Sequence, residues 1–134
     1  MNTLEGVHPK LVEKVERMLK GMEAWGHPML IVEGVRTAKR QAELYAQGRT
    51  KPGKIVTQLD GVTKKSNHQV KEDGFGYAVD LCFVVDGQPS WDDAHPWKVM
   101  GAMAQHLGLI WGGAWVRFVD RPHVELVRLK DPHA

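Results

Sequence analysis

The sequence has a single cysteine, few aromatic residues and almost no excess of charge of either sign. One cysteine, Cys82, cannot form an internal disulfide, and it excludes zinc sites built from several cysteines. A formal net charge of +2, from 18 basic and 16 acidic residues, is too small to indicate a nucleic-acid-binding surface. We therefore expect no nucleic-acid partner. Cys82 lies in an apolar run, where a packed thiol is the plain interpretation.

Long hydrophobic runs are also absent. No segment approaches the roughly 20 apolar residues that span a bilayer. The first residues, MNTLEGVHPKLVEK, contain no basic segment followed by an apolar one. These absences predict no membrane insertion and synthesis in the cytoplasm without a signal peptide. The length of 134 residues predicts one domain, residues 1–134, which we expect to be a monomer.

Residue spacing and capping residues predict three helices. The predicted helices are Pro9 to about Trp25, a segment capped by Thr37 that extends to about Gln47, and about Ala94 to Leu107 with Asp92 or Asp93 as its cap. The second helix is expected to present one face formed by Ala38, Gln41, Ala42 and Tyr45. The basic segment that follows it, residues 49–65, is predicted to be a long loop with at most a short strand at Lys54–Thr57.

β-branched and aromatic residues predict four short strands. These are Met29–Val32, Tyr77–Val85, Leu109–Trp111 and His123–Leu129. Asp86-Gly87 predicts a tight turn after the second of them. Helices and short strands in mixed order predict an α+β fold, in which a small antiparallel sheet is flanked by helices.

The main chemical signal is an aspartate inside an apolar strand. Asp80 lies within AVDLCFVV, where an ionised carboxylate is costly unless it is paired or binds a metal. His68 in SNHQ and His123 in DRPHVEL are its candidate partners. Two imidazoles and a carboxylate with an open fourth position are typical of a catalytic zinc site. Their spacing alone does not define a set, since an HEXXH signature is absent and a single histidine is more often structural.

Peptide hydrolysis also requires a general base and a group that stabilises the oxyanion. Asp120, three residues before His123, and Glu125, two residues after it, are both candidates for the base, and their spacing leaves the choice open. Arg36 follows a predicted strand and could stabilise the oxyanion. The alternative for Arg36 is a surface arginine near a helix N-terminus.

Four motifs in chain order resemble the D-Ala-D-Ala metallopeptidase family, and most closely its phage endolysin-type L-alanyl-D-glutamate peptidases. The motifs are GVRTAKRQAELYAQGRTKPGKIVT, SNHQ with GYAVDL, LGLIWGGAW, and FVDRPHVEL, and they extend from about Gly34 to Leu126. The resemblance implies the VanY-like hedgehog/DD-peptidase fold and a single catalytic domain without a separate cell-wall-binding domain.

The resemblance also assigns roles to individual residues. It implies zinc ligation by His68, Asp80 and His123, general-base catalysis by Asp120, oxyanion stabilisation by Arg36, and a supporting role for Ser66. The gap between the first histidine and the aspartate exceeds the family's commonest length of six residues, because of the insertion VKEDGFG. The role of this longer loop is left open.

The activity implied by the resemblance is hydrolysis of the L-Ala–D-Glu bond in peptidoglycan stem peptides. The implied setting is phage or prophage lysis, in which the enzyme reaches the cell wall after its release from the cytoplasm. Two alternatives are a D-Ala-D-Ala carboxypeptidase or dipeptidase with the same site, and a non-catalytic wall-binding domain.

Overall fold

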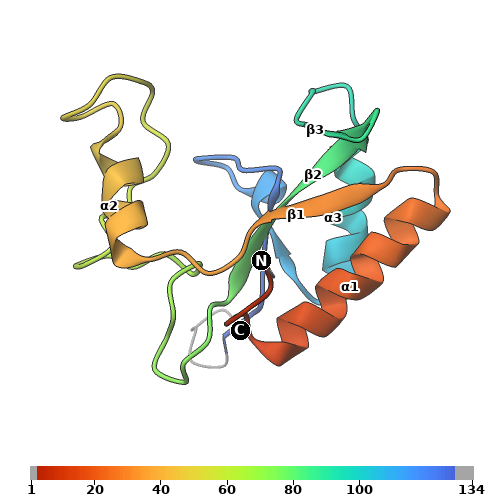
Figure 1. Ribbon diagram of the computed structural model, residues 1–134, viewed down its shortest axis with the longest axis horizontal. Coiled ribbons are helices and arrows are strands. Elements are labelled where there is room, and N and C mark those ends of the chain that lie inside the picture. The colour runs from red at the N-terminus through yellow and green to blue at the C-terminus, as the bar shows by residue number, and fades with distance from the viewer. Residues whose placement is uncertain (1–2, 129–134) are drawn as a thin grey trace.

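The structure is a computed structural model that describes residues 3–128 (Figure 1). This part of the chain forms three α-helices, five short strands and one 3-10 helix. In chain order they are α1 (Pro9–Ala24), β1 (Met29–Glu33), α2 (Ala38–Ala46), β2 (Ala78–Val85), β3 (Gln88–Ser90), α3 (Trp97–His106), β4 (Ile110–Trp111), η1 (Gly112–Ala114) and β5 (His123–Glu125).

The five strands form one sheet with β2 near its centre. Its order is β1-β2-β5-β4, and β3 also pairs with β2. All of these pairs are antiparallel. The predicted α+β fold with a small antiparallel sheet is therefore confirmed.

The hydrophobic core lies between one face of the sheet and the helices α1 and α3. α1 buries Leu11, Val15, Met18 and Met22, which recur at helical spacing. β2 contributes Val79, Leu81 and Phe83 to the same core. Figure 1 shows α1 and α3 close together beside the sheet, with α2 apart from them. Because side chains alternate along a strand, Asp80 points to the face of β2 opposite the core.

The helix α2 has the predicted cap, and Gln41 is the buried residue of its predicted face. Thr37 caps it, since its hydroxyl accepts a hydrogen bond of 3.1 Å from the Arg40 amide. Gln41 is the buried residue of this helix, whereas Ala38 and Ala42 are exposed. The alanines of that face are exposed because α2 contributes no residue to the core cluster.

Other boundaries also differ from the predictions. α3 begins at Trp97 with Pro96 at its cap position, because the Asp92 carboxylate accepts a bond from the Ala94 amide in a separate turn before the helix. Residues 54–57 form no strand, and β5 ends at Glu125. The predicted extension of that strand was wrong for residues 126–128, which form no strand, and Leu129 lies outside the described residues.

The strand β3 was not expected, although the turn before it was. Asp86 and Gly87 adopt φ values of 51° and 76°, as a two-residue hairpin turn requires. Within residues 3–128, no helix combines the length and the apolar character needed to cross a bilayer.

Candidate active site

Strand register brings three polar residues into one row across the sheet. Asp80 on β2 lies opposite Glu33 on β1 and opposite His123 on β5. A β-bulge between Ile31 and Glu33 sets the first of these pairs, because it adds one residue to β1 at this point. Directly opposed residues of antiparallel strands share a face of the sheet. The three side chains therefore lie together on the face opposite the core.

The loop before β2 adds His68 to this row and completes a possible metal site. Asp80 Oδ1 lies 3.3 Å from His68 Nε2 and 3.3 Å from His123 Nδ1. The three ligand atoms lie within 4.8 Å of one another. Bonds of 2.0–2.2 Å in a tetrahedral arrangement would separate neighbouring ligand atoms by about 3.3–3.6 Å. The spacing of the carboxylate oxygen from both imidazole nitrogens fits a zinc ion.

Two atoms of this group are buried without hydrogen-bond partners. They are His68 Nε2 and Asp80 Oδ1. Buried polar atoms in native proteins are almost always paired, and an unpaired one needs an explanation such as an ion. A cation between these side chains would satisfy both atoms at once. The residues present therefore fit a bound metal.

Each imidazole is oriented by a hydrogen bond at its other ring nitrogen. His68 Nδ1 lies 2.9 Å from the Gly34 carbonyl oxygen. Because a carbonyl only accepts, Nδ1 carries the proton and Nε2 presents a lone pair toward Asp80. His123 has the opposite arrangement, since its Nε2 bonds Glu125 Oε1 at 2.7 Å and leaves Nδ1 toward the metal position. These outer contacts fix both rings for metal binding.

Glu125 is positioned to support His123 rather than to act as the general base. Its side chain is buried, and its second carboxylate oxygen accepts a 2.6 Å bond from Asn67 Nδ2. Both oxygens are therefore engaged by neighbouring side chains. Glu125 therefore differs in its contacts from Asp120, the other candidate for the base.

Glu125→Gln is expected to lower zinc affinity by about 10–100-fold, the usual cost of losing a carboxylate that orients a ligating histidine. Competition with a chromogenic chelator measures this affinity. Glu16→Gln, an exposed change on α1, is the matched control. Equal zinc affinity in Glu125→Gln and in the parent protein would show that the contact does not support the metal ligand.

Without a metal, the imidazole of His123 lies between the carboxylates of Asp80 and Glu125. Burial opposes ionisation of Asp80, but the adjacent His123 and His68 side chains hold the pKa of its carboxyl below the usual range. Burial also opposes protonation of His123, yet Asp80 and Glu125 together raise its pKa to about 9. A cation would replace the proton that His123 otherwise holds between these two carboxylates.

Asp120 lies at the mouth of this group in a turn that leads into β5. The His123 amide donates to the Asp120 carbonyl at 3.1 Å, which closes the turn across Arg121 and Pro122. The carboxylate Oδ2 lies 3.9 Å from His123 Nδ1. Partial burial and the neighbouring Asp80 charge raise the pKa of Asp120. A carboxylate with a raised pKa, close to the metal position, is suited to accept and return a proton.

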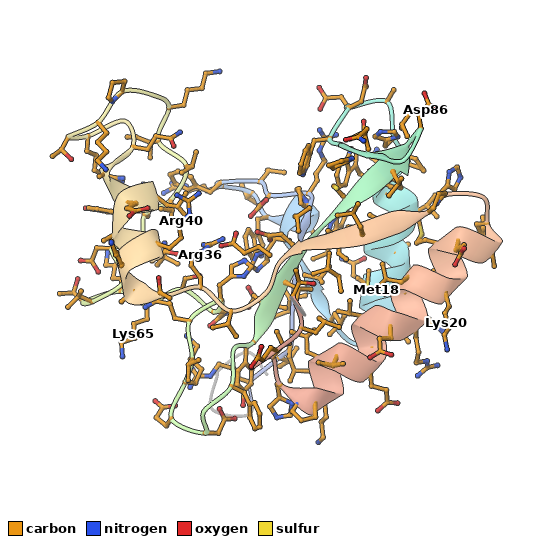
Figure 2. All side chains as sticks on the ribbon, in the orientation of Figure 1. Met18, Lys20, Arg36, Arg40, Lys65 and Asp86 are labelled. Atoms are coloured by element: carbon orange, nitrogen blue, oxygen red, sulfur yellow. The ribbon has the colours of Figure 1, made fainter. Side chains whose placement is uncertain are left out.

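Arg36 lies between α2 and the sheet (Figure 2) and is held on several sides. Glu33 accepts two bonds from it, at 2.8 Å from Nε and 2.7 Å from Nη2. Gln41 Oε1 accepts a third, at 2.8 Å from Nη1. The guanidinium Nη2 also lies 3.5 Å from Asp80 Oδ2. Three of its five N–H groups therefore donate to Glu33 and Gln41, and a fourth, on Nη2, lies on the side of Asp80.

Gln41 connects Arg36 to the loop that follows α2. Its amide nitrogen donates to the Leu59 carbonyl at 2.8 Å and to the Thr57 hydroxyl at 3.3 Å. Because Gln41 is fully buried, these bonds fix the loop relative to the arginine. Ser66 has a comparable local role, since its hydroxyl accepts a 3.1 Å bond from the His68 amide.

The GGAW motif supports the turn that carries Asp120 and His123. A Cβ atom on Gly112 would lie 2.3 Å from the Asp120 carbonyl oxygen and 3.0 Å from the His123 Cβ. Only glycine therefore fits this approach. Trp111 Nε1 donates to the Arg121 carbonyl at 2.8 Å. The Trp115 ring lies 5.0 Å from the His123 ring.

A cavity of about 790 Å³ opens onto the group, and its lining includes Arg36, His68, Asp120 and His123. The structure thus brings together all of the residues that the sequence nominated for catalysis and metal binding. Asp73, in the longer loop, lies elsewhere and bonds the Tyr77 hydroxyl.

Sequence reasoning did not identify Glu33 and Gln41. Glu33 reaches the site only through the bulge in β1, which leaves no pattern in the sequence. Gln41 belongs to the predicted face of α2, and the only feature that could have indicated its role is that it is a polar residue beside alanines.

Comparison with known proteins identifies relatives along most of the chain. A family described as D-alanyl-D-alanine carboxypeptidase (peptidase family M15) matches residues 60–126. The peptidoglycan L-alanyl-D-glutamate endopeptidase CwlK of Bacillus subtilis (strain 168) is 34% identical over 130 residues, covering 90% of this chain and 74% of CwlK. The L-alanyl-D-glutamate peptidase of Listeria phage A118 is 30% identical over 111 residues, covering 81% of this chain and 34% of the phage protein.

Solved structures agree with these matches. The L-Ala D-Glu endopeptidase ChiX of Serratia marcescens has a TM-score of 0.65 and 29% identity, covering 93% of this chain and 84% of ChiX. The LD-carboxypeptidase LdcB, at 18% identity and a TM-score of 0.63, covers 94% of this chain and 68% of its own and shares the fold. On the evidence of its sequence relatives and its fold, this chain belongs to the D-alanyl-D-alanine carboxypeptidase (M15) family of peptidases.

Proposed function

We propose that this protein is a zinc-dependent endopeptidase that hydrolyses the L-Ala–D-Glu bond of peptidoglycan stem peptides. The observation that carries the proposal is the convergence of His68 Nε2, Asp80 Oδ1 and His123 Nδ1 on one point at the wall of a cavity. The choice of bond rests on the two relatives and the neighbouring structure whose names specify L-Ala and D-Glu.

The chemistry divides between the metal and the residues around it. When bound, zinc supplies a Lewis acid that polarises a carbonyl oxygen and makes water acidic near neutral pH. Asp120 takes the proton of the attacking water and returns it to the leaving amine, a role that its raised pKa favours. Arg36, which lines the cavity, would donate to the carbonyl oxygen, on which negative charge develops as water attacks.

The proposed substrate is the bacterial cell wall, and the proposed form of the enzyme is a monomer. Similarity to a phage peptidase supports action on peptidoglycan during host lysis, after synthesis in the host cytoplasm. The described residues form a single core beside the site, which supports one catalytic domain.

Digestion of purified peptidoglycan tests the choice of bond. Mass spectrometry of the products should reveal new N-terminal D-glutamate, with activity lost on chelation and restored by zinc. Release of free D-alanine instead would identify the protein as a D-Ala-D-Ala carboxypeptidase or dipeptidase. No cleavage by the zinc-loaded protein would favour a non-catalytic wall-binding domain.

The stability of the protein is expected to depend on pH in opposite directions with and without zinc. The raised pKa of His123, about 9 against an ordinary value of 6.5, stabilises the metal-free fold fully below pH 6.5. That contribution disappears as the pH rises through about 9. Zinc requires the neutral imidazole, so the zinc-loaded protein should gain stability over the same range. Thermal unfolding from pH 6 to 9.5, in EDTA and in zinc, measures both trends; parallel curves would contradict the competition between proton and metal.

A further inference from the structure

The cavity beside Asp120 has apolar walls that water can reach. Ile55 and Val56, in the loop after α2, are 47% and 49% exposed, and Phe118 and Val119, between η1 and β5, are 46% and 57% exposed. All four line the cavity that also contains Asp120. Exposed apolar side chains gathered around a cavity indicate a binding surface. These walls can therefore contact the apolar parts of a substrate.

The two walls belong to segments that approach each other across the site. Figure 1 shows the segment between η1 and β5 projecting toward the loop that follows α2. Both ends of this segment are tied to one atom, since the Trp115 and Asp120 amides lie 3.2 Å and 3.0 Å from the Gly112 carbonyl oxygen. The connection holds Phe118, two residues before Asp120, near the reacting groups.

The backbone of Phe118 is held in an unfavourable conformation. Its φ of 51° lies in the left-handed region, which bulky side chains rarely adopt. Among residues 3–128, the other non-glycine residue with a positive φ is Asp86, whose hairpin turn requires it. The Phe118 ring is half exposed and is absent from the core cluster. Strain of this kind is concentrated at functional sites, and burial of the ring contributes little to the fold.

We propose that Phe118 determines substrate specificity by packing its ring against the methyl group of the alanine at the cleaved bond. The inference rests on the proposed function, in which this alanine precedes the scissile bond. Its methyl group is attached to the carbon next to the reacting carbonyl. Phe118 lines the same cavity as Asp120, His68 and His123, so the ring and the reacting carbonyl would share this cavity.

The contact is tested with two synthetic stem peptides, one with L-Ala and one with glycine before D-Glu. The zinc-loaded parent should cleave the alanyl peptide with about fourfold higher kcat/KM, the effect of burying one methyl group. Phe118→Gly should reduce this preference to below twofold and raise KM for the alanyl peptide. Its Tm should be unchanged or higher, because glycine accepts the positive φ without strain.

Val116→Gly is the matched control, because Val116 lies in the same segment, is 96% exposed and does not line the cavity. It should retain the fourfold preference. A Phe118→Gly protein that keeps the preference would overturn the contact, and one whose Tm falls by several degrees would assign Phe118 to the fold. Failure of both the parent and Val116→Gly to cleave the alanyl peptide would instead refute the proposed function.

Discussion

Asp120→Asn is expected to reduce the rate of stem-peptide hydrolysis by about 10²–10⁴-fold, the contribution of a positioned general base. The amide has nearly the same shape as the carboxylate but cannot accept a proton from water. Zinc content should be unchanged, because Asp120 is not among the three converging ligand atoms. The loss should appear mainly in kcat, since the substitution leaves the cavity walls intact.

Steady-state kinetics on a stem peptide, together with metal analysis of the same preparations, tests this expectation. Asp86→Asn is the control, because it makes the same chemical change in the exposed turn between β2 and β3 (Figure 2). Near-normal activity in zinc-loaded Asp120→Asn would eliminate Asp120 as the base. Loss of zinc together with activity would indicate that its carboxylate serves the metal.

Asp80→Asn is expected to abolish both zinc binding and hydrolysis. The Asp80 carboxylate lies between the two imidazoles and supplies the only negative charge among the three ligand atoms. Replacing it with an amide removes one anionic ligand, so the loss of affinity should exceed the roughly 10–100-fold expected for Glu125→Gln. The change also removes one of the two carboxylates that raise the pKa of His123, so this pKa should move toward its ordinary value.

Isothermal titration with zinc and NMR titration of the His123 ring in EDTA measure these two effects independently of catalysis. Asp86→Asn should again match the parent protein. Zinc affinity in Asp80→Asn equal to that of the parent would refute the ligand set. An unchanged His123 pKa would show that Asp80 is not its main electrostatic partner.

The central strand β2 was predictable because it is rich in β-branched and apolar residues and contains one charged residue, Asp80. Val79, Leu81 and Phe83 are core residues and Asp80 lies between them, so alternation alone placed the carboxylate on the opposite face. The same logic located α1, whose apolar residues repeat at helical spacing. A regular repeat of apolar residues indicates which face of an element is buried, and such a repeat is present in both α1 and β2.

Features that depend on tertiary contacts were not predictable from local pattern. The bulge in β1, which places Glu33 beside Asp80, depends on pairing between strands and not on a residue type. The hydrogen bonds of Glu125 to His123 and Asn67, which distinguish it from Asp120, also depend on the folded structure. The start of α3 was misplaced because Asp92 caps an isolated turn instead of the helix.

The detached position of α2 has a consequence for how this enzyme can change over evolutionary time. Gln41 is the buried residue of this helix, and the loop that follows the helix forms one wall of the cavity. Substitutions or insertions in that loop would alter which cell-wall peptides are accepted at little cost to folding. The fold thus places two of the possible metal ligands on the sheet and one wall of the cavity on a loop that lies outside the hydrophobic core.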